Sequence, residues 1–366
     1  MKPFGRIEHS GRFADTAAAR SARYYFTVPG DFLVTTRDLT TAADFLGLVA
    51  RVPEDKAYLV NQGANVLRVD EAVVDARYFV YWTCSDTYRR HIQERHTGST
   101  QIHIRADDLL DAPVFLPPIE DQRRIVEVLS ALDDKVDLNR RMNETLDAIA
   151  RRVFGKAALV AASTVPVDDV ATINATQLRS GDGISAIEYV EISEVSQGYV
   201  GKVVKYERGT EPSRARRRVA HGDTVLSTVR PDRRAYFLAL NPAPSLVVST
   251  GFAVVSPKTV PWSYLHVALT DPSIFEELGR LADGGAYPAV RPEIIAALEL
   301  PKLSDEDLRT FHEVVAPLLE RAAANRNESQ TLAELRDTLL PKLLSGELRV
   351  REAEEVVTEA TAGATA

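Results

Sequence analysis

Apolar residues recur at every seventh position in two separate stretches of the chain. The first stretch has a polar residue at the middle step of the series Ile125, Leu132, Asn139, Leu146 and Val153. The second stretch repeats this arrangement 186 positions later in the series Phe311, Leu318, Asn325, Leu332 and Leu339. A seven-residue apolar repeat is typical of long helices that pack along each other. The pattern therefore predicts two long helices that are copies of one another.

The boundaries of these helices carry their own signals. Pro117 and Pro118 precede the first helix, and Ser304 suits the N-cap of the second. Glycine is a common helix stop, so we expect the helices to end at Gly155 and Gly346. The second helix should be kinked or shortened, because its pattern contains Pro317 and Pro341.

A polar residue at one inward position fixes the register of a helix pair at some cost in stability. If the two helices pack antiparallel, Asn139 and Asn325 meet near the centre. The alternative is that both asparagines face solvent on helices that pack only on their own domains. The residues expected to set the register are Asn139, Asn325, Leu132, Leu146, Leu318 and Leu332.

The repeat extends beyond the helices. The segment Gly30–Thr36 has a counterpart in Gly222–Thr228, a Gly-Asp turn entering a strand, and Gly98–Arg105 has one in Gly285–Arg291. We therefore expect an α/β (α+β) protein with two mixed domains and two long helices packed as an antiparallel coiled coil. The expected boundaries are 1–115 for the first domain, 116–158 for the first helix, 159–300 for the second domain, 301–350 for the second helix and 351–366 for a disordered tail.

The two domains differ in length before the Gly-Asp turn. The turn lies 63 residues past Leu159 in the second domain but only 29 residues past Met1 in the first. The first domain is therefore expected to be shortened at its N-terminal end, as a truncated or variant domain; the alternative is that the true start lies upstream.

Composition indicates the cellular compartment of the chain and the class of its binding partners. With one cysteine in 366 residues the chain can form no internal disulfide, which favours a reducing cytoplasm. It has no apolar run of membrane-spanning length, and Met1–Ser10 lacks the apolar core of a signal peptide. The net charge is −8, yet Lys202–Arg234 carries ten basic and four acidic residues. Such a local excess of cations favours contact with nucleic acid, although a solvated loop is the alternative.

Arginine neutralises phosphates and, with Ser, Thr and Gln, can contact base edges. In the second domain the candidate DNA-binding residues are Arg214, Arg216, Arg217, Arg218, Arg230, Arg233 and Arg234. In the first domain the weaker candidates are Arg37, Arg89, Arg90, Arg95, Ser99, Thr100 and Gln101.

Catalytic motifs are missing from the sequence. Asn241–Pro244 lacks the aromatic residue of an adenine methyltransferase loop, and no glycine-rich phosphate loop is present. His91 and His96 are five positions apart, so they fall on different sides of a helix, form no metal site and are expected at the surface. We expect no catalytic residue, no metal and no bound cofactor.

Two segments carry a family resemblance. Leu116–Leu146 and Leu335–Leu348 resemble the conserved regions of the specificity subunit of type I restriction-modification enzymes. The resemblance covers residues 25–350. It implies that two target recognition domains each bind one half of a split sequence in double-stranded DNA, with the helices as a ruler between them.

The resemblance also implies partners for the chain. They are two methyltransferase subunits and ATP-dependent restriction subunits, which together form a site-specific deoxyribonuclease and adenine methyltransferase using S-adenosylmethionine, ATP and Mg. The alternative is a degenerate or truncated paralogue that serves as a protein-binding scaffold or half-site reader. A self-contained methyltransferase is disfavoured by the missing loops.

Overall fold

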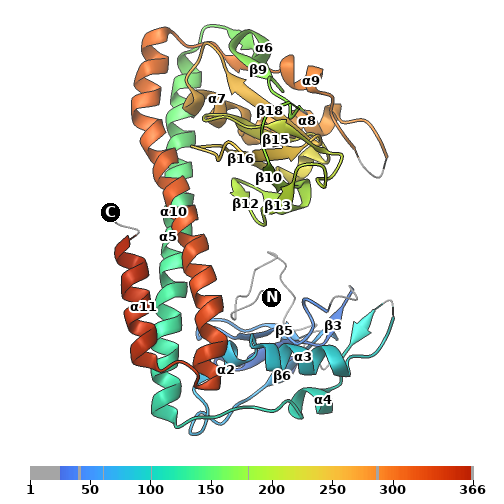
Figure 1. Cartoon of the computed structure of the whole chain (residues 1–366), viewed down its shortest axis with the longest axis vertical. Helices are drawn as coiled ribbons and strands as arrows, with labels where there is room; N and C mark the ends of the chain where they lie inside the picture. The colour runs from blue at the N-terminus through green and yellow to red at the C-terminus, as the bar shows by residue number, and fades with distance from the viewer. Residues whose placement is uncertain are drawn as a thin grey trace. The chain divides into compact units, whose positions relative to one another are not determined.

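The computed structural model describes residues 25–39, 43–60, 62–99, 101–179, 181–285 and 288–363. The chain divides into two compact units, Met1–Asp137 with Ser329–Ala366 and Leu138–Glu328. Both long helices, α5 (Ile119–Val160) and α10 (Asp305–Ser345), contribute one segment to each unit (Figure 1). The protein is thus a mixed helix and sheet fold, as expected. None of the helices in these ranges has the length and apolar character needed to cross a membrane.

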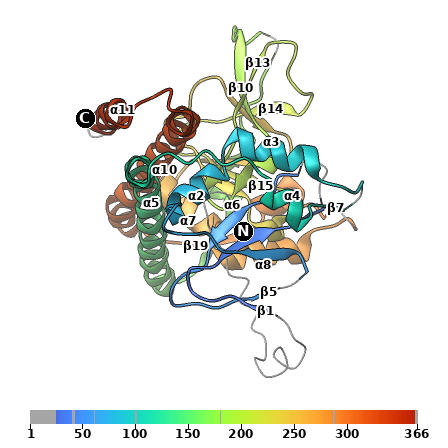
Figure 2. The ribbon, with the colours of Figure 1, turned by 90° about the horizontal axis from the view of Figure 1, so that it is seen from below.

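The first unit is built around a small antiparallel sheet. Its central strand β2 (Phe32–Thr35) lies between β4 (Val49–Arg51) and β6 (Ala64–Leu67). Two shorter pairs join β1 (Tyr25–Phe26) to β5 (Leu59–Val60), as Figure 2 shows, and β3 (Arg37–Asp38) to β7 (Ile102–His103). Besides the long helices, the described residues of this unit form the helices α2 (Ala76–Trp82), α3 (Asp86–Arg95), α4 (Ala106–Leu110) and α11 (Val350–Gly363).

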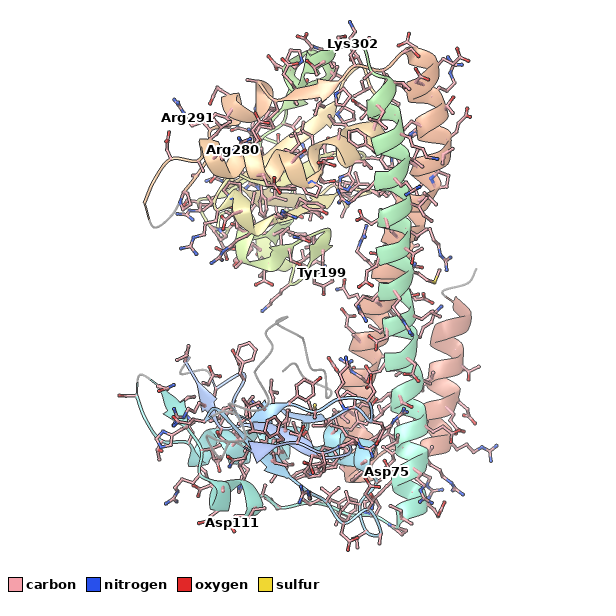
Figure 3. All side chains as sticks on the ribbon, turned by 180° about the vertical axis from the view of Figure 1, so that it is seen from behind. Asp75, Asp111, Tyr199, Arg280, Arg291 and Lys302 are labelled. Carbon is pink, nitrogen blue, oxygen red and sulfur yellow. The ribbon has the colours of Figure 1, made fainter. Side chains whose placement is uncertain are left out.

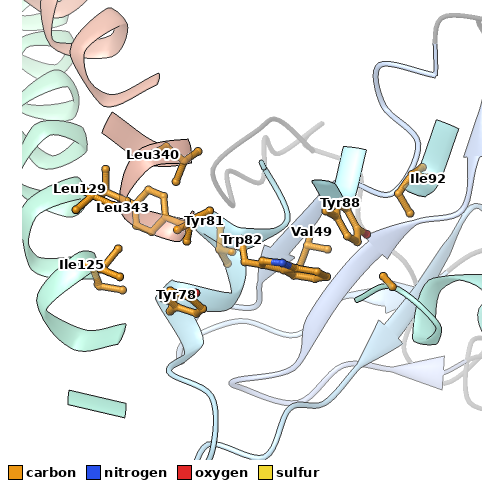
Figure 4. Packing of buried hydrophobic residues seen from close by; sticks show 14 of the residues in the cluster. Val49, Tyr78, Tyr81, Trp82, Tyr88, Ile92, Ile125, Leu129, Leu340 and Leu343 are labelled. Carbon is orange, nitrogen blue, oxygen red and sulfur yellow. The ribbon is translucent and has the colours of Figure 1, made fainter. Parts of the chain in front are cut away.

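Aromatic residues of α2 and α3 connect this sheet to the long helices. Trp82 packs edge-on against Tyr88, with ring centroids 4.9 Å apart. Tyr78 and Tyr81 lie in the same cluster as Leu129 of α5 and Leu340 of α10 (Figure 4). One continuous core therefore holds the first unit and its helix segments together.

The second unit contains two four-stranded sheets among the described residues. The first has the order β13 (Val204–Glu207), β10 (Ala186–Val190), β17 (Leu246–Ser249) and β14 (Ala215–Arg218). The second has the order β16 (Tyr236–Leu238), β15 (Thr224–Ser227), β18 (Phe252–Pro257) and β9 (Ala171–Ile173). Shorter pairs join β11 (Val195–Ser196) to β12 (Tyr199–Val200) and β8 (Thr164–Pro166) to β19 (Glu299–Pro301).

Three of the short helices of the second unit repeat short helices of the first. They are α6 (Val167–Val170), α7 (Trp262–Leu269), α8 (Pro272–Leu281), α9 (Pro292–Ala296) and the 3₁₀ turns η1 (Ile192–Glu194) and η2 (Pro231–Arg233). The first residues of α7, α8, α9 and α10 lie 186 positions after those of α2, α3, α4 and α5. Tyr78 and Tyr264 are also 186 apart, and each donates its hydroxyl to a matching carbonyl, that of Phe115 or Pro301. The predicted duplication is confirmed.

The Gly-Asp turns are equally alike. Gly30 and Gly222 both have a left-handed φ of 85°, a conformation that favours glycine. The Asp31 carboxylate accepts the Val28 N–H at 2.9 Å, and the Asp223 carboxylate accepts the Ala220 N–H at 2.7 Å. Each turn leads into the central strand of its sheet, β2 or β15, as predicted.

The helix ends differ in part from expectation. Ser304 caps α10 by accepting the Asp307 N–H at 3.2 Å, and Gly346 follows its end with a left-handed φ of 75°. Gly155, however, does not stop α5, which continues to Val160 because this glycine keeps a helical backbone. Pro317 and Pro341, which were expected to kink or shorten α10, do not shorten it, since the helix runs through both. Buried neighbours, Ala316 and Leu340 among them, offset the backbone hydrogen bond that each proline removes.

The expected disordered tail is likewise wrong as far as Gly363. Residues 350–363 form the helix α11. Val350, Ala353 and Val357 are spaced by three and four residues and pack on the core of the first unit, where Ala353 is fully buried. The apolar spacing outweighs the acidic composition of this segment.

Candidate nucleic-acid interface

The fold separates the basic segment into two groups. Arg214 to Arg218 belong to β14 and the residue before it, whereas Arg230 to Arg234 follow β15 of the other sheet. The first group contacts the turn Thr250–Gly251, which joins β17 to β18. Thr250 donates its N–H to the Arg214 carbonyl at 2.9 Å, and Arg217 Nη2 donates to the Thr250 carbonyl at 3.1 Å.

The same turn also contacts Thr228, which follows β15 and lies two residues before Arg230. This residue donates its N–H to the Gly251 carbonyl at 2.9 Å and its hydroxyl to the same oxygen at 2.8 Å. Arg230 and Arg234 flank η2 with left-handed φ values of 49° and 53°, which few non-glycine residues adopt. Such conformations cluster at binding and catalytic sites, so the η2 corner fits a functional surface.

These arginines differ in whether a carboxylate already pairs with their positive charge. Three are paired with carboxylates, at 3.7 Å for Arg216–Glu211, 3.9 Å for Arg218–Asp182 and 3.8 Å for Arg234–Glu276. Arg217 is half-buried, and burial lowers the pKa of its guanidinium. Arg214 and Arg233 are exposed, and no described carboxylate forms an ion pair with either. These two side chains are therefore the best placed to contact a phosphate.

Two further cations that the sequence patterns did not single out lie on the same unit. Arg280 of α8 lines an open pocket together with Asp232, Arg234 and Glu276. Arg291 precedes α9 and is exposed; both side chains are labelled in Figure 3. Neither belongs to the basic segment 202–234, so only the folded chain associates Arg280 with η2.

In both units a short hairpin built around a glycine, called here the glycine hairpin, lies next to the end of the strand that follows the Gly-Asp turn. Thr97 and His103 exchange two backbone bonds of 2.9 Å around Gly98, and Asp283 and Ala289 exchange bonds of 3.0 and 2.8 Å around Gly284. The Thr36 carbonyl accepts the Ile104 N–H at 3.1 Å, and the Thr228 carbonyl accepts the Val290 N–H at 2.9 Å. The two units thus present the same pair of loops.

In the described part of the first unit the candidate residues are placed differently from one another. Arg37, Arg90, Ser99 and Gln101 are exposed, and Arg95 lies 3.8 Å from the Asp111 carboxylate. Thr100 lies outside the described residues.

Arg89 is the clearest departure from the expected DNA-contact role. Its guanidinium donates to the carbonyls of Leu46 at 2.5 Å and Ala43 at 2.6 Å. Because its donors are used in holding that loop, Arg89 is better explained as a structural residue than as a DNA contact.

His91 is not at the surface as expected. It is 8% exposed, and its Nε2 lies 2.7 Å from the Asp108 carbonyl. It falls on the buried face of α3 between Tyr88 and Ile92, whose spacing from it is helical. Among the described residues no group of three His, Cys, Asp or Glu side chains could hold a metal ion.

Within the second unit the two long helices meet through a buried polar layer. Asn139 and Asn325 are 0% and 1% exposed, so they do not face solvent. Asn139 Nδ2 donates to the Asn325 carbonyl at 3.3 Å and to Glu328 Oε2 at 2.7 Å. Asn143 Nδ2 donates to the Ala322 carbonyl at 3.1 Å. Positions rise along α5 as they fall along α10, so these helix segments run antiparallel.

The other expected register residues are buried to different degrees. In the first unit Leu132 and Leu332 are 1% and 3% exposed. In the second unit Leu146 and Leu318 are only partly buried. Of these four leucines, only the two in the first unit are therefore fully buried.

Comparison with known proteins gives consistent matches. Residues 15–148 match the family model described as "Type I restriction modification DNA specificity domain". The chain is 23% identical over 342 residues to the type I restriction enzyme HindI specificity subunit of Haemophilus influenzae, covering 71% of this chain and 74% of that protein. It is 25% identical over 323 residues to the MjaIX specificity subunit of Methanocaldococcus jannaschii, covering 80% and 73%.

One solved structure supports the fold. The S subunit of a type I restriction-modification system from M. genitalium aligns with a TM-score of 0.50 and 16% identity. The alignment covers 93% of this chain and 87% of that one. At this identity the likeness bears on architecture alone.

Proposed function

Because this chain belongs to the specificity subunits of type I restriction-modification enzymes, we propose that each of its two units recognises one half of a split DNA target. The recognition domains are residues 1–115 and 159–300, and the conserved helices are 116–158 and 301–350. The observation that carries the proposal is the duplicated pairing of a glycine hairpin with the end of a central strand, around Gly98 and Thr36 and around Gly284 and Thr228.

The second unit has the stronger support as a DNA reader. Its loops are accompanied by the exposed cations Arg214 and Arg233, with Arg280 and Arg291 on the same unit. Phosphate contacts of this kind supply affinity and register, while loop side chains distinguish the bases. Three of the other basic candidates, Arg216, Arg218 and Arg234, are half-exposed and can exchange their weak ion pairs for phosphates.

The two long helices act as an antiparallel coiled coil that fixes the spacing of the half-sites. The 42 residues of α5 span about 63 Å at a rise of about 1.5 Å per residue. This length is compatible with half-sites that are one DNA turn, roughly 34–36 Å, apart. The buried asparagines support the assignment because they restrict which turns of the helices can meet.

Chemistry in the assembly comes from other subunits. Specificity subunits are a non-catalytic family, and the duplicated units are suited to recruiting two methyltransferase subunits and the restriction subunits. S-adenosylmethionine, ATP and Mg are assigned to those partners.

Selection of duplexes from a random DNA library tests this function. The chain is purified with the methyltransferase subunit of its system, and bound duplexes are sequenced. The expected result is enrichment of two short specified segments separated by a fixed unspecified spacer. Enrichment of one contiguous motif, or no enrichment beyond the methyltransferase subunit alone, would contradict it.

A further inference from the structure

One arginine of the second unit, Arg326 of α10, is half-buried without an ion-pair partner among the described residues. Its side chain forms no hydrogen bond with these residues either. Burial lowers the pKa of its guanidinium, as expected for a cation that is partly removed from water. Part of the side chain is exposed to solvent, so a ligand can reach it.

The internal repeat shows what is missing beside this arginine. Arg140 lies 186 positions earlier, and its guanidinium pairs with the Glu144 carboxylate at 2.7 Å. The position that matches Glu144 is Gln330, which carries no charge and donates its amide to Glu334 at 3.1 Å. The carboxylate that pairs with the first arginine is therefore replaced by a neutral side chain beside the second.

A second arginine, Arg151 of α5, extends from the other long helix toward the sheet of the same unit. Its Nε donates to the Asp147 carboxylate at 2.7 Å. Its two Nη atoms donate to the Thr270 carbonyl at 2.8 Å and to the Tyr236 hydroxyl at 3.2 Å. These bonds hold its guanidinium, which is 24% exposed, against the end of α7 and the start of β16, both beside the helix pair in Figure 1.

The antiparallel pairing of the helices directs the two arginines toward each other. Asn143 of α5 bonds the Ala322 carbonyl of α10, and the two arginines lie beyond this level in opposite directions. Side chains lean toward the N-terminus of their helix, so Arg151 and Arg326 both lean back toward it. Burial raises the pKa of Tyr236, and the charges of both arginines oppose that rise, which places both near the phenol.

The carboxylates near these arginines are already engaged. Asp147, whose charge acts on both arginines, forms its ion pair with Arg151 and is 53% exposed. Asp271, whose charge acts on Arg151, caps α8. Burial lowers the pKa of the neighbouring His266 to about 3, so this ring adds no charge at neutral pH. Arg326 is therefore a half-buried cation without an anion of its own.

This pair of arginines is continuous with the candidate DNA-binding corner. Arg234 caps the end of η2, and Tyr236 begins β16 two positions later. The Tyr236 ring stacks on Phe275 with centroids 5.5 Å apart, and Phe275 lines the open pocket together with Arg234 and Arg280. Within the second unit, cationic side chains thus extend from the η2 corner to the helix pair.

We propose that Arg151 and Arg326 bind a backbone phosphate of the DNA, next to the half-site that the second unit recognises. The identity of this ligand rests on the proposed function. A guanidinium matches phosphate geometry with two parallel donors, and it keeps its charge at any pH that the fold tolerates. The Tyr236 hydroxyl accepts from Arg151, so its own proton can be donated to the same phosphate.

The salt dependence of DNA binding tests this ligand in the complex with the methyltransferase subunit. Arg326→Gln should lower the slope of log affinity against log salt by about 0.9, the value for one phosphate contact. Arg321→Gln removes the same charge from an exposed position of α10 and should leave the slope unchanged. An unchanged slope for Arg326→Gln, or an equal fall for both variants, would overturn the proposal.

Two further outcomes would assign the site to another ligand and also overturn the proposal. If Arg326→Gln keeps the slope but weakens binding of the methyltransferase subunit, a carboxylate of that partner occupies the site. The other outcome uses inorganic phosphate, added to the chain at constant ionic strength. If it raises the melting temperature of the unaltered chain but not of Arg326→Gln, and the slope is unchanged, the site holds free phosphate.

Thermal unfolding of the full chain separates a binding role from a structural one. Arg326→Met removes a half-buried cation that lacks an anion, so it should raise the melting temperature by about 2 °C or more. Arg321→Met is the matched control on the same helix and should leave the melting temperature unchanged. An equal or lower melting temperature for Arg326→Met would show that the fold needs this cation, and the proposal would fail.

These measurements remain informative if the proposed function fails. The unfolding experiment contains no DNA, and the slope is measured on an unrelated duplex as well as on the selected target. A missing split target would overturn the proposed function, whereas an unchanged slope on both duplexes would overturn the phosphate site.

Discussion

Asn139 Nδ2 of α5 donates to the Asn325 carbonyl of α10 at 3.3 Å, and both side chains are at most 1% exposed. The two residues occupy the same step of a duplicated heptad series, 186 positions apart. Replacing both with leucine should raise the free energy of unfolding by about 1 kcal/mol, because a buried polar pair gives way to apolar packing. Thermal melting measures this effect.

The same double variant should loosen the helix register. DNA selection with the Asn139→Leu, Asn325→Leu chain should then return half-sites at more than one spacing. A single unchanged spacing would count against the ruler role. The surface variant Glu144→Gln on α5, where Glu144 pairs with Arg140 at 2.7 Å, provides the control.

Much of this helix pair could be predicted from the sequence. Heptad spacing and two matching asparagines are local patterns, and so are the Gly-Asp turns, because glycine supplies the left-handed φ that each turn needs. The duplication then follows from comparing the chain with itself. These features depend on residues close together in the sequence.

Other features depend on contacts between distant residues. The structural role of Arg89 could not be predicted from the sequence. The carbonyls that it bonds, those of Ala43 and Leu46, lie 46 and 43 positions away along the chain. The Thr250–Gly251 turn carries no motif, yet it joins Arg214 to Thr228. Helix α11 was not predicted because the acidic composition of the tail was given more weight than the helical spacing of Val350 and Ala353.

The two members of a buried ion pair in the first unit should contribute to the free energy of unfolding in a strongly coupled way. Arg336 Nη1 donates to Asp133 Oδ1 at 2.6 Å, with the two side chains 9% and 17% exposed. The Tyr81 hydroxyl also donates to this carboxylate at 2.6 Å. Arg336→Met should cost about 3 kcal/mol of unfolding free energy, because it leaves a buried carboxylate without its cation.

The double variant Asp133→Leu, Arg336→Met provides the matched comparison. It should lie within about 1 kcal/mol of the unaltered chain, since apolar packing replaces both charges. Urea unfolding of the single and double variants measures the coupling. Additive costs of the two single changes would rule out a coupled pair.

Removing the charge of the equivalent aspartates in the two Gly-Asp turns should change the free energy of unfolding by different amounts. The Arg68 side chain bonds Asp31 at 2.7 Å and holds the pKa of that carboxyl below its usual value. Burial raises the pKa of Asp223 instead. The charge on Asp31 therefore stabilises the fold above its ordinary pKa of about 4, and this contribution is lost as pH falls through the lowered value.

Asp31→Asn should cost about 1 kcal/mol at pH 7, and the cost should shrink at pH 3. Asp223→Asn should cost less at pH 7, because a carboxyl with a raised pKa gains stability as pH falls toward it. Both amides can still accept the turn N–H. Unfolding curves at the two pH values decide this, and an equal cost for both variants at pH 7 would contradict the assignment.

Exposed arginines of the second unit should set the salt dependence of DNA binding. Arg214→Ala with Arg233→Ala should lower the slope of log affinity against log salt by about 2, since each lost phosphate contact removes about 0.9. Arg208→Ala is the control, because Arg208 is bonded to Glu211 and to the Arg179 carbonyl. Fluorescence anisotropy on the complex with the methyltransferase subunit gives both slopes, and equal slopes would remove these arginines from the interface.

The division of labour between the units is tested most directly by mapping adenine methylation in cells that express the chain with its methyltransferase subunit. The unaltered chain should direct methylation to a motif of two specified halves with a fixed spacer. The Arg214→Ala, Arg233→Ala chain should methylate sites in which one half is relaxed and the other is unchanged. Loss of specificity in both halves together, or a motif without two halves, would contradict independent recognition by the two units.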